Sequence, residues 1–114
     1  MELYNMTNNN VLTITKDNFE NEVVQSNIPV LIDFWAAWCA PCRMLSPAIE
    51  TLAGEMSGKI KVGKINVDEQ PELAANFRIM SIPTVILAKG NSVLMQSVGV
   101  KSKESLKREI ESKI

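Results

Sequence analysis

The sequence predicts one α/β domain whose central mixed β-sheet carries helices on both faces. Segments with strand character alternate along the chain with segments of helical periodicity, without a linker or an internal repeat. A hairpin follows near the C-terminus, so antiparallel strands should join an N-terminal βαβ half that is parallel. The predicted order is β-α-β-α-β-α-β-β-α. A chain of 114 residues is long enough for one hydrophobic core and too short for two.

The N-terminal segment predicts a tail, a strand and a helix. Residues 1–10 are rich in Asn and are expected to be loosely ordered, which leaves residues 11–114 as the domain. Residues 11–15 have the character of a short strand. Thr15 or Asp17 can cap the helix that follows. The side chains expected to point inward from that helix are Phe19, Val23 and Val24.

The centre of the sheet is predicted at residues 30–35, whose near-continuous apolar character suits a strand covered on both faces. The next helix should begin around residues 39–41, where a proline is tolerated in the first turn. Pro47 falls inside this helix and should bend it. The apolar face of the helix recurs at helical spacing through Cys42, Leu45, Ile49, Leu52, Ala53 and Met56.

The second half predicts three strands and two helices. Residues 59–67 alternate as a strand, and residues 71–77 can form a short helix. Residues 82–88 and 92–98 predict a hairpin that turns at the Gly-Asn pair between them. The last helix should be capped by Ser102 and packed through Leu106, Ile110 and Ile114.

Composition narrows the partners and the compartment. The formal net charge of −1 gives no reason to expect nucleic acid or an anionic membrane as a partner. No apolar stretch approaches the ~20 residues of a membrane span. The first residues lack both the basic start and the apolar core of a signal peptide, so a cytoplasmic protein is expected. The chain has no His, which excludes His-based acid–base chemistry.

The chemistry is predicted at Cys39 and Cys42, the only cysteines of the chain. Two thiols separated by two residues can close into a disulfide and reopen with little backbone movement. The pair follows the central strand and precedes a helix, so the first thiol falls near a strand-to-helix junction. There the unpaired N–H groups and the positive dipole end of the helix favour a thiolate over a thiol. This arrangement indicates a redox site.

Three structural interpretations of the pair compete with this one. A structural zinc site normally needs four Cys or His ligands, and this chain offers two. A purely structural disulfide would gain little, because so short a loop removes little entropy from the unfolded state. Two inert buried thiols are the third alternative. The neighbouring proline and the junction argue instead for an exposed turn.

Three other positions are candidates for a role at the site. Asp33 interrupts the apolar central strand, and burial there would raise its pKa and suit it to moving a proton at the dithiol. The alternative is that Asp33 lies at the solvent-exposed end of the strand. Lys64, on the neighbouring strand, could reach Asp33 and tune its charge, or be a solvated surface lysine. Pro83 stands at the entrance of a strand. The bond that precedes a proline is cis in only about 5–6% of cases in folded proteins.

In this set of motifs the chain resembles the thioredoxin family. Residues 34–44 look like the active-site motif of the family, and Pro47 follows at the family's helix kink. Residues 64–68, 79–84 and 98–99 match later family segments in order and spacing. The resemblance covers roughly residues 11–114. It implies the thioredoxin fold, with Pro83 in cis facing the dithiol and Asp33 buried behind Cys42.

The resemblance also implies a protein-disulfide reductase that works through a mixed disulfide. Cys39 would be the nucleophile and Cys42 the resolving thiol, with Asp33 transferring its proton and Lys64 tuning Asp33. Disulfide-containing proteins would be the substrates. The substrate would dock on an apolar rim composed of Trp38, Ala40, Pro41, Ile82, Pro83, Gly99 and Val100.

By the same resemblance a thioredoxin reductase would restore the dithiol, with electrons from NADPH or ferredoxin. No cofactor or metal would be bound by the chain, and a monomer is expected. Two other functions are compatible with the fold. One is a protein-disulfide oxidant or isomerase, although such proteins tend to carry His between the cysteines. The other is a binding or structural subunit in which the dithiol is dispensable.

The chain departs from the usual family pattern around the dithiol. Ala40 replaces a Gly between the cysteines, and Ala37 replaces a common acidic residue. Met80 stands in place of a common basic residue, next to Ser81, where many members have Gly. Val100 is larger than the usual residue. These changes predict a more apolar docking rim and a specialised set of partners.

Overall fold

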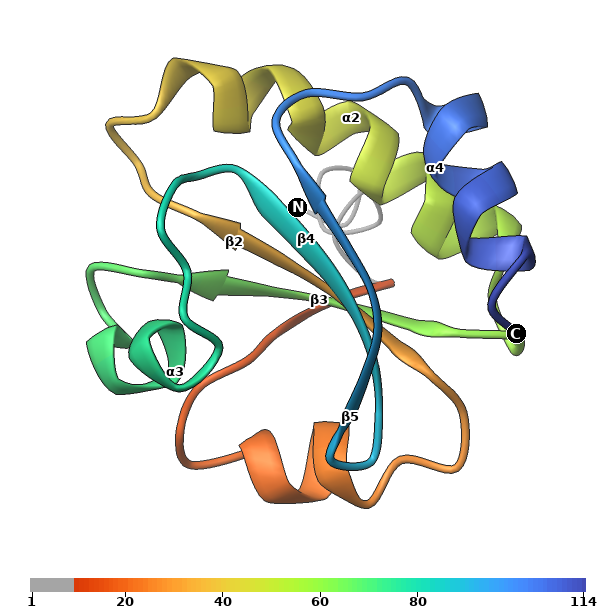
Figure 1. Ribbon diagram of the computed structural model, residues 1–114, viewed down its shortest axis with the longest axis horizontal. Helices are drawn as coiled ribbons and strands as arrows, with labels where there is room; N and C mark the ends of the chain where they lie inside the picture. Colours follow the sequence, from red (N-terminus) through yellow and green to blue (C-terminus); the bar gives the residue numbers. More distant parts are fainter. Residues whose placement is uncertain (1–9) are drawn as a thin grey trace, which may run out of the picture.

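The computed structural model describes residues 10–114 and has a five-stranded mixed sheet at its centre (Figure 1). The strand order is β1-β3-β2-β4-β5. β1 and β2 run parallel to β3, whereas β4 runs antiparallel to β2 and β5, so the predicted mixed sheet is confirmed. The expected loose tail lies outside the described residues, except for Asn10. The strands are β1 (Val11–Thr13), β2 (Val30–Trp35), β3 (Lys61–Asn66), β4 (Thr84–Lys89) and β5 (Ser92–Val98).

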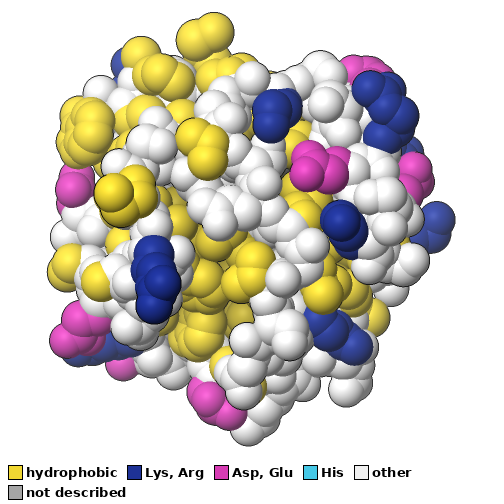
Figure 2. All heavy atoms as spheres, viewed as in Figure 1, with side chains coloured by type: hydrophobic (Ala, Val, Ile, Leu, Met, Phe, Trp, Pro, Cys, Tyr) yellow, Lys and Arg dark blue, Asp and Glu magenta, His cyan; other side chains and the backbone are white. Residues whose placement is uncertain are grey.

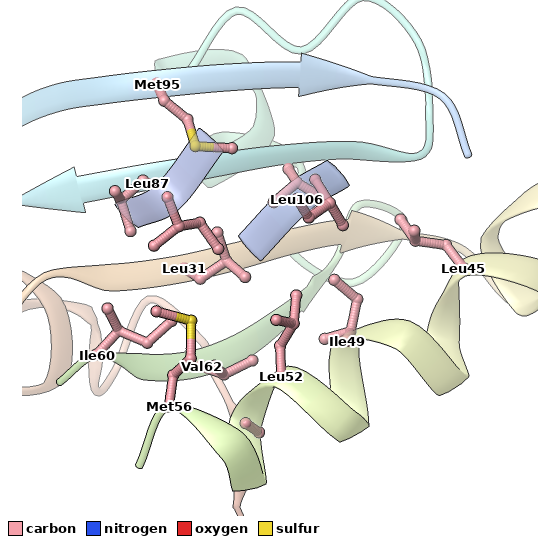
Figure 3. Close-up of a cluster of buried hydrophobic side chains, with 13 residues drawn as sticks. Leu31, Leu45, Ile49, Leu52, Met56, Ile60, Val62, Leu87, Met95 and Leu106 are labelled. Atoms are coloured by element: carbon pink, nitrogen blue, oxygen red, sulfur yellow. The ribbon is translucent and has the colours of Figure 1, made fainter. Parts of the chain in front are cut away.

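Helices cover both faces of the sheet, as predicted. α2 (Ala40–Glu55) and α4 (Lys103–Glu111) lie on one face, and η1 (Glu20–Val24) and α3 (Pro71–Asn76) on the other (Figure 1). Each face holds its own hydrophobic cluster. The cluster beneath α2 and α4 is the larger, and Figure 3 shows its side chains converging from both helices and the sheet. Its labelled members are Leu31, Leu45, Ile49, Leu52, Met56, Ile60, Val62, Leu87, Met95 and Leu106.

The central strand β2 contributes to both clusters, which explains its continuous apolar character. Leu31 belongs to the cluster beneath α2, whereas Ile32 and Phe34 belong to the cluster on the η1 side. Successive side chains of a strand point to opposite faces. Asp33 and Trp35 therefore share the face of Leu31, beneath α2.

The first predicted helix differs from the structure. A turn closed by Asn18 precedes a single π-helical turn, η1, and neither Thr15 nor Asp17 caps it. The side-chain oxygen of Asn18 accepts the Thr15 N–H at 2.8 Å, and its amide donates to the Thr13 carbonyl at 2.9 Å. These side-chain bonds satisfy the backbone locally in place of a longer helix. Val23 is buried as expected, whereas Phe19 and Val24 are half-buried.

The C-terminal helix agrees with its predicted start and differs at its end. The Ser102 hydroxyl accepts the Ser105 N–H at 3.1 Å and caps α4 as predicted. Ile114 was expected in the core but is 50% exposed, because α4 ends at Glu111. On the surface, Glu55 at the end of α2 accepts hydrogen bonds from two lysines of α4, Lys103 and Lys107, at 2.8 and 3.1 Å.

The predicted hairpin forms between β4 and β5, although its first strand begins at Thr84 rather than at residue 82. Gly90 occupies the turn with φ +60°, a backbone conformation that side chains with a Cβ rarely adopt. The turn is therefore where the sequence placed it.

Arg78 ends α3 in the left-handed conformation usually taken by glycine, with φ 57°. Its N–H donates to the Ala75 carbonyl, and the Ile79 N–H donates to the Ala74 carbonyl, both at 3.0 Å. We expect Arg78→Gly to raise the free energy of unfolding by about 0.5–1 kcal/mol, because it removes the steric cost of a Cβ in this conformation. Urea denaturation measures the change. Arg78→Ala is the control, since it removes the long side chain but keeps the Cβ. Equal stability of these two variants would contradict the prediction.

Candidate active site

The two cysteines lie where β2 passes into α2, and they are joined as a disulfide with 5.3 Å between their Cα atoms. Cys39 is the N-cap residue of α2, and its Sγ accepts the Cys42 N–H at 3.2 Å. An N-cap side chain faces the unpaired N–H groups of the first helical turn, where negative charge is stabilised. The predicted helix start and the predicted environment of the first sulfur are thus both present.

The cysteines are more buried than an exposed turn would make them. Cys39 is 4% exposed and Cys42 is 3% exposed, because Ala36, Val67 and Ile82 pack around them. The residues that flank the cysteines are exposed to solvent, as expected for the predicted turn. These are Ala37, Trp38, Ala40 and Pro41.

A second loop faces the dithiol from the start of β4. The Ile82–Pro83 peptide bond is cis, as the family resemblance implied. The Ile82 carbonyl oxygen lies 4.0 Å from the Cys39 Sγ, and the Gly99 N–H donates to the Pro83 carbonyl at 2.9 Å. The Ile82–Pro83 segment, far from Cys39 in the sequence, is therefore brought beside it, and Gly99 lies beside Pro83. Pro83 is buried, Ile82 and Gly99 are half-buried, and Val100 is exposed.

The surface around the dithiol is apolar. Figure 2 shows hydrophobic side chains gathered at the upper left of the view, over the first turns of α2 and the loop before β4. Trp38 is 68% exposed there and Met80 is 94% exposed. The indole nitrogen of Trp38 donates to the Asp68 carboxylate at 2.9 Å, which holds the ring in place. Exposed, oriented apolar side chains of this kind are typical of a docking surface.

Asp33 is fully buried beneath α2, so the alternative of a solvent-exposed strand end is wrong. It is 1% exposed, and within residues 10–114 neither of its carboxylate oxygens has a hydrogen-bond donor. Burial disfavours the charged form and raises the pKa of Asp33 from 3.8 to about 6, while the positive charge of Lys64 partly offsets this rise. An acid with such a pKa exchanges its proton near neutral pH.

Lys64 is the register partner of Asp33 on β3, but the two side chains form no ion pair within 4 Å. Its Nζ lies 4.9 Å from the centre of the Trp35 ring and 3.4 Å from the Ser46 Oγ. Lys64 is half-buried, which differs from a fully solvated surface lysine. It therefore influences Asp33 through space rather than by contact.

We expect Lys64→Met to raise the pKa of Asp33 further, because the positive charge that lowers it is removed. NMR titration of the Asp33 carboxyl carbon in the oxidised protein measures the change. Lys61→Met is the matched control, since Lys61 lies on the same strand but pairs with Glu22 at 3.0 Å. An unchanged Asp33 titration in Lys64→Met, or an equal change in both variants, would refute the through-space role.

Three polar contacts of the site were not anticipated. Arg43 turns back from α2 and donates to the Ala37 carbonyl at 2.8 Å, which braces the loop before Cys39. Ser46 contacts Lys64, and Asp68 holds Trp38. Arg43 and Ser46 each lie four residues after a cysteine, on the same helical face. That spacing was the one sequence signal that could have suggested them.

A Cys39–Cys42 disulfide at a helix N-terminus, facing a proline loop and an apolar rim, is the arrangement of a thiol–disulfide oxidoreductase. The thioredoxin family model matches residues 10–112. A thioredoxin of Alicyclobacillus acidocaldarius is 48% identical over 99 residues, covering 87% of this chain and 93% of that protein. A thioredoxin of Rickettsia bellii is 48% identical over 93 residues, covering 82% and 89%. Thioredoxin 1 of a Nostoc species is 44% identical over 98 residues, covering 86% and 92%.

The chain belongs to the thioredoxin family and is a protein-disulfide reductase that acts by thiol–disulfide exchange. Thioredoxins need no bound cofactor, and within residues 10–114 no cluster of acidic or cysteine side chains is placed to hold a metal ion. No helix in this described part of the chain is long and apolar enough to cross a membrane.

Proposed function

We propose that Cys39 is the nucleophile, Cys42 the resolving thiol and Asp33 the group that takes the proton of Cys42. The position of the Cys39 sulfur carries this proposal. It accepts the Cys42 N–H at the start of α2 and lies 4.0 Å from the Ile82 carbonyl of the facing loop. The exposed fractions of the two cysteines are nearly equal, so position rather than exposure distinguishes them. Cys42 lies one turn further along the helix, away from the rim.

The reaction follows in two exchanges. The Cys39 thiolate attacks one sulfur of a substrate disulfide, forms a mixed disulfide and releases the first substrate thiolate. The Cys42 thiol loses its proton, attacks the Cys39 sulfur and releases the second substrate thiolate. Two electrons pass to the substrate, whose sulfurs are reduced. The protein is left with the Cys39–Cys42 disulfide.

A chain of contacts supports Asp33 as the proton acceptor. Ser46 follows Cys42 by four residues, so both side chains occupy one face of α2. Ser46 contacts Lys64, and Lys64 is paired in register with Asp33. The Asp33 side chain points from β2 toward this face of α2. The carboxyl group is therefore beneath the first turns of the helix, with Lys64 tuning its charge.

The apolar rim supports docking of an extended substrate segment beside Pro83. We assign docking to Trp38, Ala40, Pro41, Ile82, Pro83, Gly99 and Val100. Of these, Ile82 lies beside the Cys39 sulfur and Gly99 donates to the Pro83 carbonyl. We propose that the functional unit is residues 11–114, with residues 1–10 as an appendage. A thioredoxin reductase that draws on NADPH or ferredoxin restores the dithiol of a monomeric cytoplasmic protein.

Alkylation of the reduced protein tests the assignment of the two thiols. Limiting iodoacetamide at pH 7, followed by peptide mass mapping, should modify Cys39 well before Cys42, because only Cys39 lies at the helix N-terminus beside the rim. Preferential modification of Cys42 would reverse the roles. Equal modification would remove the basis for distinguishing them.

A further inference from the structure

A hollow of about 320 Å³ lies beside the Cys39 sulfur, and it shares Trp38 and Ile82 with the docking rim assigned above. Two of its lining residues connect it to the reaction. Trp38 directly precedes Cys39, and the Ile82 carbonyl lies 4.0 Å from the Cys39 Sγ. A substrate cysteine attacked by Cys39 must therefore bring its neighbouring residues to the edge of this hollow.

The side chains that line the hollow are almost all apolar. Besides Trp38 and Ile82 it contains Val67, Ala74, Ile79 and Met80, and its one polar side chain is Ser81. None of these residues carries a charge. The Asp68 carboxylate, which does not line the hollow, accepts the hydrogen bond of the Trp38 ring at 2.9 Å and adds negative charge next to that wall. An acidic substrate side chain would lose hydration there without meeting a cation.

Met80 is the unusual member of this lining. It is 94% exposed, more than any other large hydrophobic side chain within residues 10–114, so it is not part of the folded core. Its side chain is unbranched and flexible, and can adapt its shape to a ligand. Contact with an apolar group would remove both surfaces from water, which is favourable.

We propose that Met80 is a specificity-determining residue, which closes the hollow around a bulky apolar side chain next to the reacting cysteine of the substrate. The inference rests on the proposed function, because it assumes that Cys39 makes the attack. The substrates favoured by this chain are then disulfides with Leu, Ile, Met or Phe beside the cysteine. Substrates with Asp or Glu at that place are disfavoured.

The test uses symmetric disulfide dimers of three short peptides that differ only in the residues flanking the cysteine: Leu, Gln or Glu. Dithiothreitol regenerates the dithiol, and chromatography of the peptide thiol gives kcat/KM. For the wild type we expect the Leu peptide to exceed the Glu peptide by about 10-fold, mainly through KM, with the Gln peptide between them. Met80→Lys should reduce this ratio to below about 2-fold. Met80→Leu should preserve it.

Met44→Lys is the matched control, because Met44 is also an exposed methionine, at 69%, but lies on α2 and does not line the hollow. It should keep the wild-type ratio. Equal kcat/KM for the three peptides with the wild type, or the same loss of discrimination in Met44→Lys and Met80→Lys, would overturn the role of Met80. Insulin reduction distinguishes a failure of the specificity proposal from a failure of the proposed function. A wild type that reduces insulin but does not discriminate among the peptides refutes only the specificity, whereas one that reduces neither refutes the proposed function.

Discussion

Replacing Cys42 by Ser should convert the protein from a catalyst into a trap for its substrates. Cys39 keeps its place at the N-terminus of α2 and can still attack a disulfide, but no second thiol remains to release the product. We expect a stable mixed disulfide, visible as an added mass that dithiothreitol removes. Turnover of insulin should fall by at least about 10³-fold.

Cys39→Ser provides the contrasting result. It should lose turnover to the same extent and form no mixed disulfide, because the remaining thiol at position 42 lies within the first turn of α2 rather than at its N-cap. Neither substitution should change the fold, which circular dichroism checks. If Cys39→Ser trapped substrate as well as Cys42→Ser does, the assignment of nucleophile would be wrong. Full activity in the variant lacking both thiols would favour a binding role.

Asp33→Asn should remove a pH dependence of stability that amounts to about 3 kcal/mol. The pKa of Asp33 rises from 3.8 to about 6 on folding, mainly because of burial and despite the opposing charge of Lys64. Each tenfold change in proton affinity corresponds to about 1.4 kcal/mol. Between these pH values the folded protein retains a proton that the unfolded chain has released. The contribution of Asp33 to stability is therefore greatest below pH 4 and is lost as pH rises through 6.

Denaturant unfolding of the oxidised protein from pH 4 to pH 8 measures this effect. The difference in unfolding free energy, Asp33→Asn minus wild type, should increase by about 2.5 kcal/mol over that range. Asp17→Asn is the control, since Asp17 is an exposed carboxyl in a turn and should leave the wild-type profile intact. A constant difference between Asp33→Asn and wild type would show that Asp33 is charged in the folded protein throughout.

Asp33→Asn should slow the reaction at neutral pH, where the same substitution stabilises the folded protein. If Asp33 accepts the Cys42 proton, its loss should reduce turnover at pH 7 by about 10²-fold, within the usual range for a general base. Mixed disulfide should then accumulate, as in Cys42→Ser, but resolve on a longer time. If Asp33→Asn is more stable than the wild type but has unchanged turnover, Asp33 is a buried charge that does not accept the Cys42 proton.

The predictability of the fold varied with the range of the interactions involved. The limits of β2 and the start of α2 were predicted correctly because an apolar run and a following proline are local features. The first helix, η1, is shorter than predicted because of the side-chain bonds of Asn18, which compete with helical backbone bonds and leave no periodic pattern in the sequence. The Ile82–Pro83 bond was implied only by the family resemblance, since local sequence hardly separates cis from trans.

The site was harder to predict where three elements meet. Asp33 lies on a strand that is buried on both faces, so its apolar neighbours did not reveal which way its side chain points. The pairing of Asp33 with Lys64 requires the register of β2 on β3. The burial of both cysteines depends in part on Val67 and Ile82, which come from distant parts of the sequence. These are long-range packing effects, which no local pattern encodes.

The length of β4 has a practical consequence for anyone who wishes to attach this protein to something else. The strand begins beside Pro83 and ends at the Gly90 turn, and six extended residues span about 20 Å. A fluorophore, an affinity tag or a bead coupled at Asn91 would therefore be attached at the end of β4 opposite the Cys39 sulfur. A tether at that turn should leave the oxidised and reduced forms equally free to meet their partners, and would make the protein a reusable reducing agent on a surface.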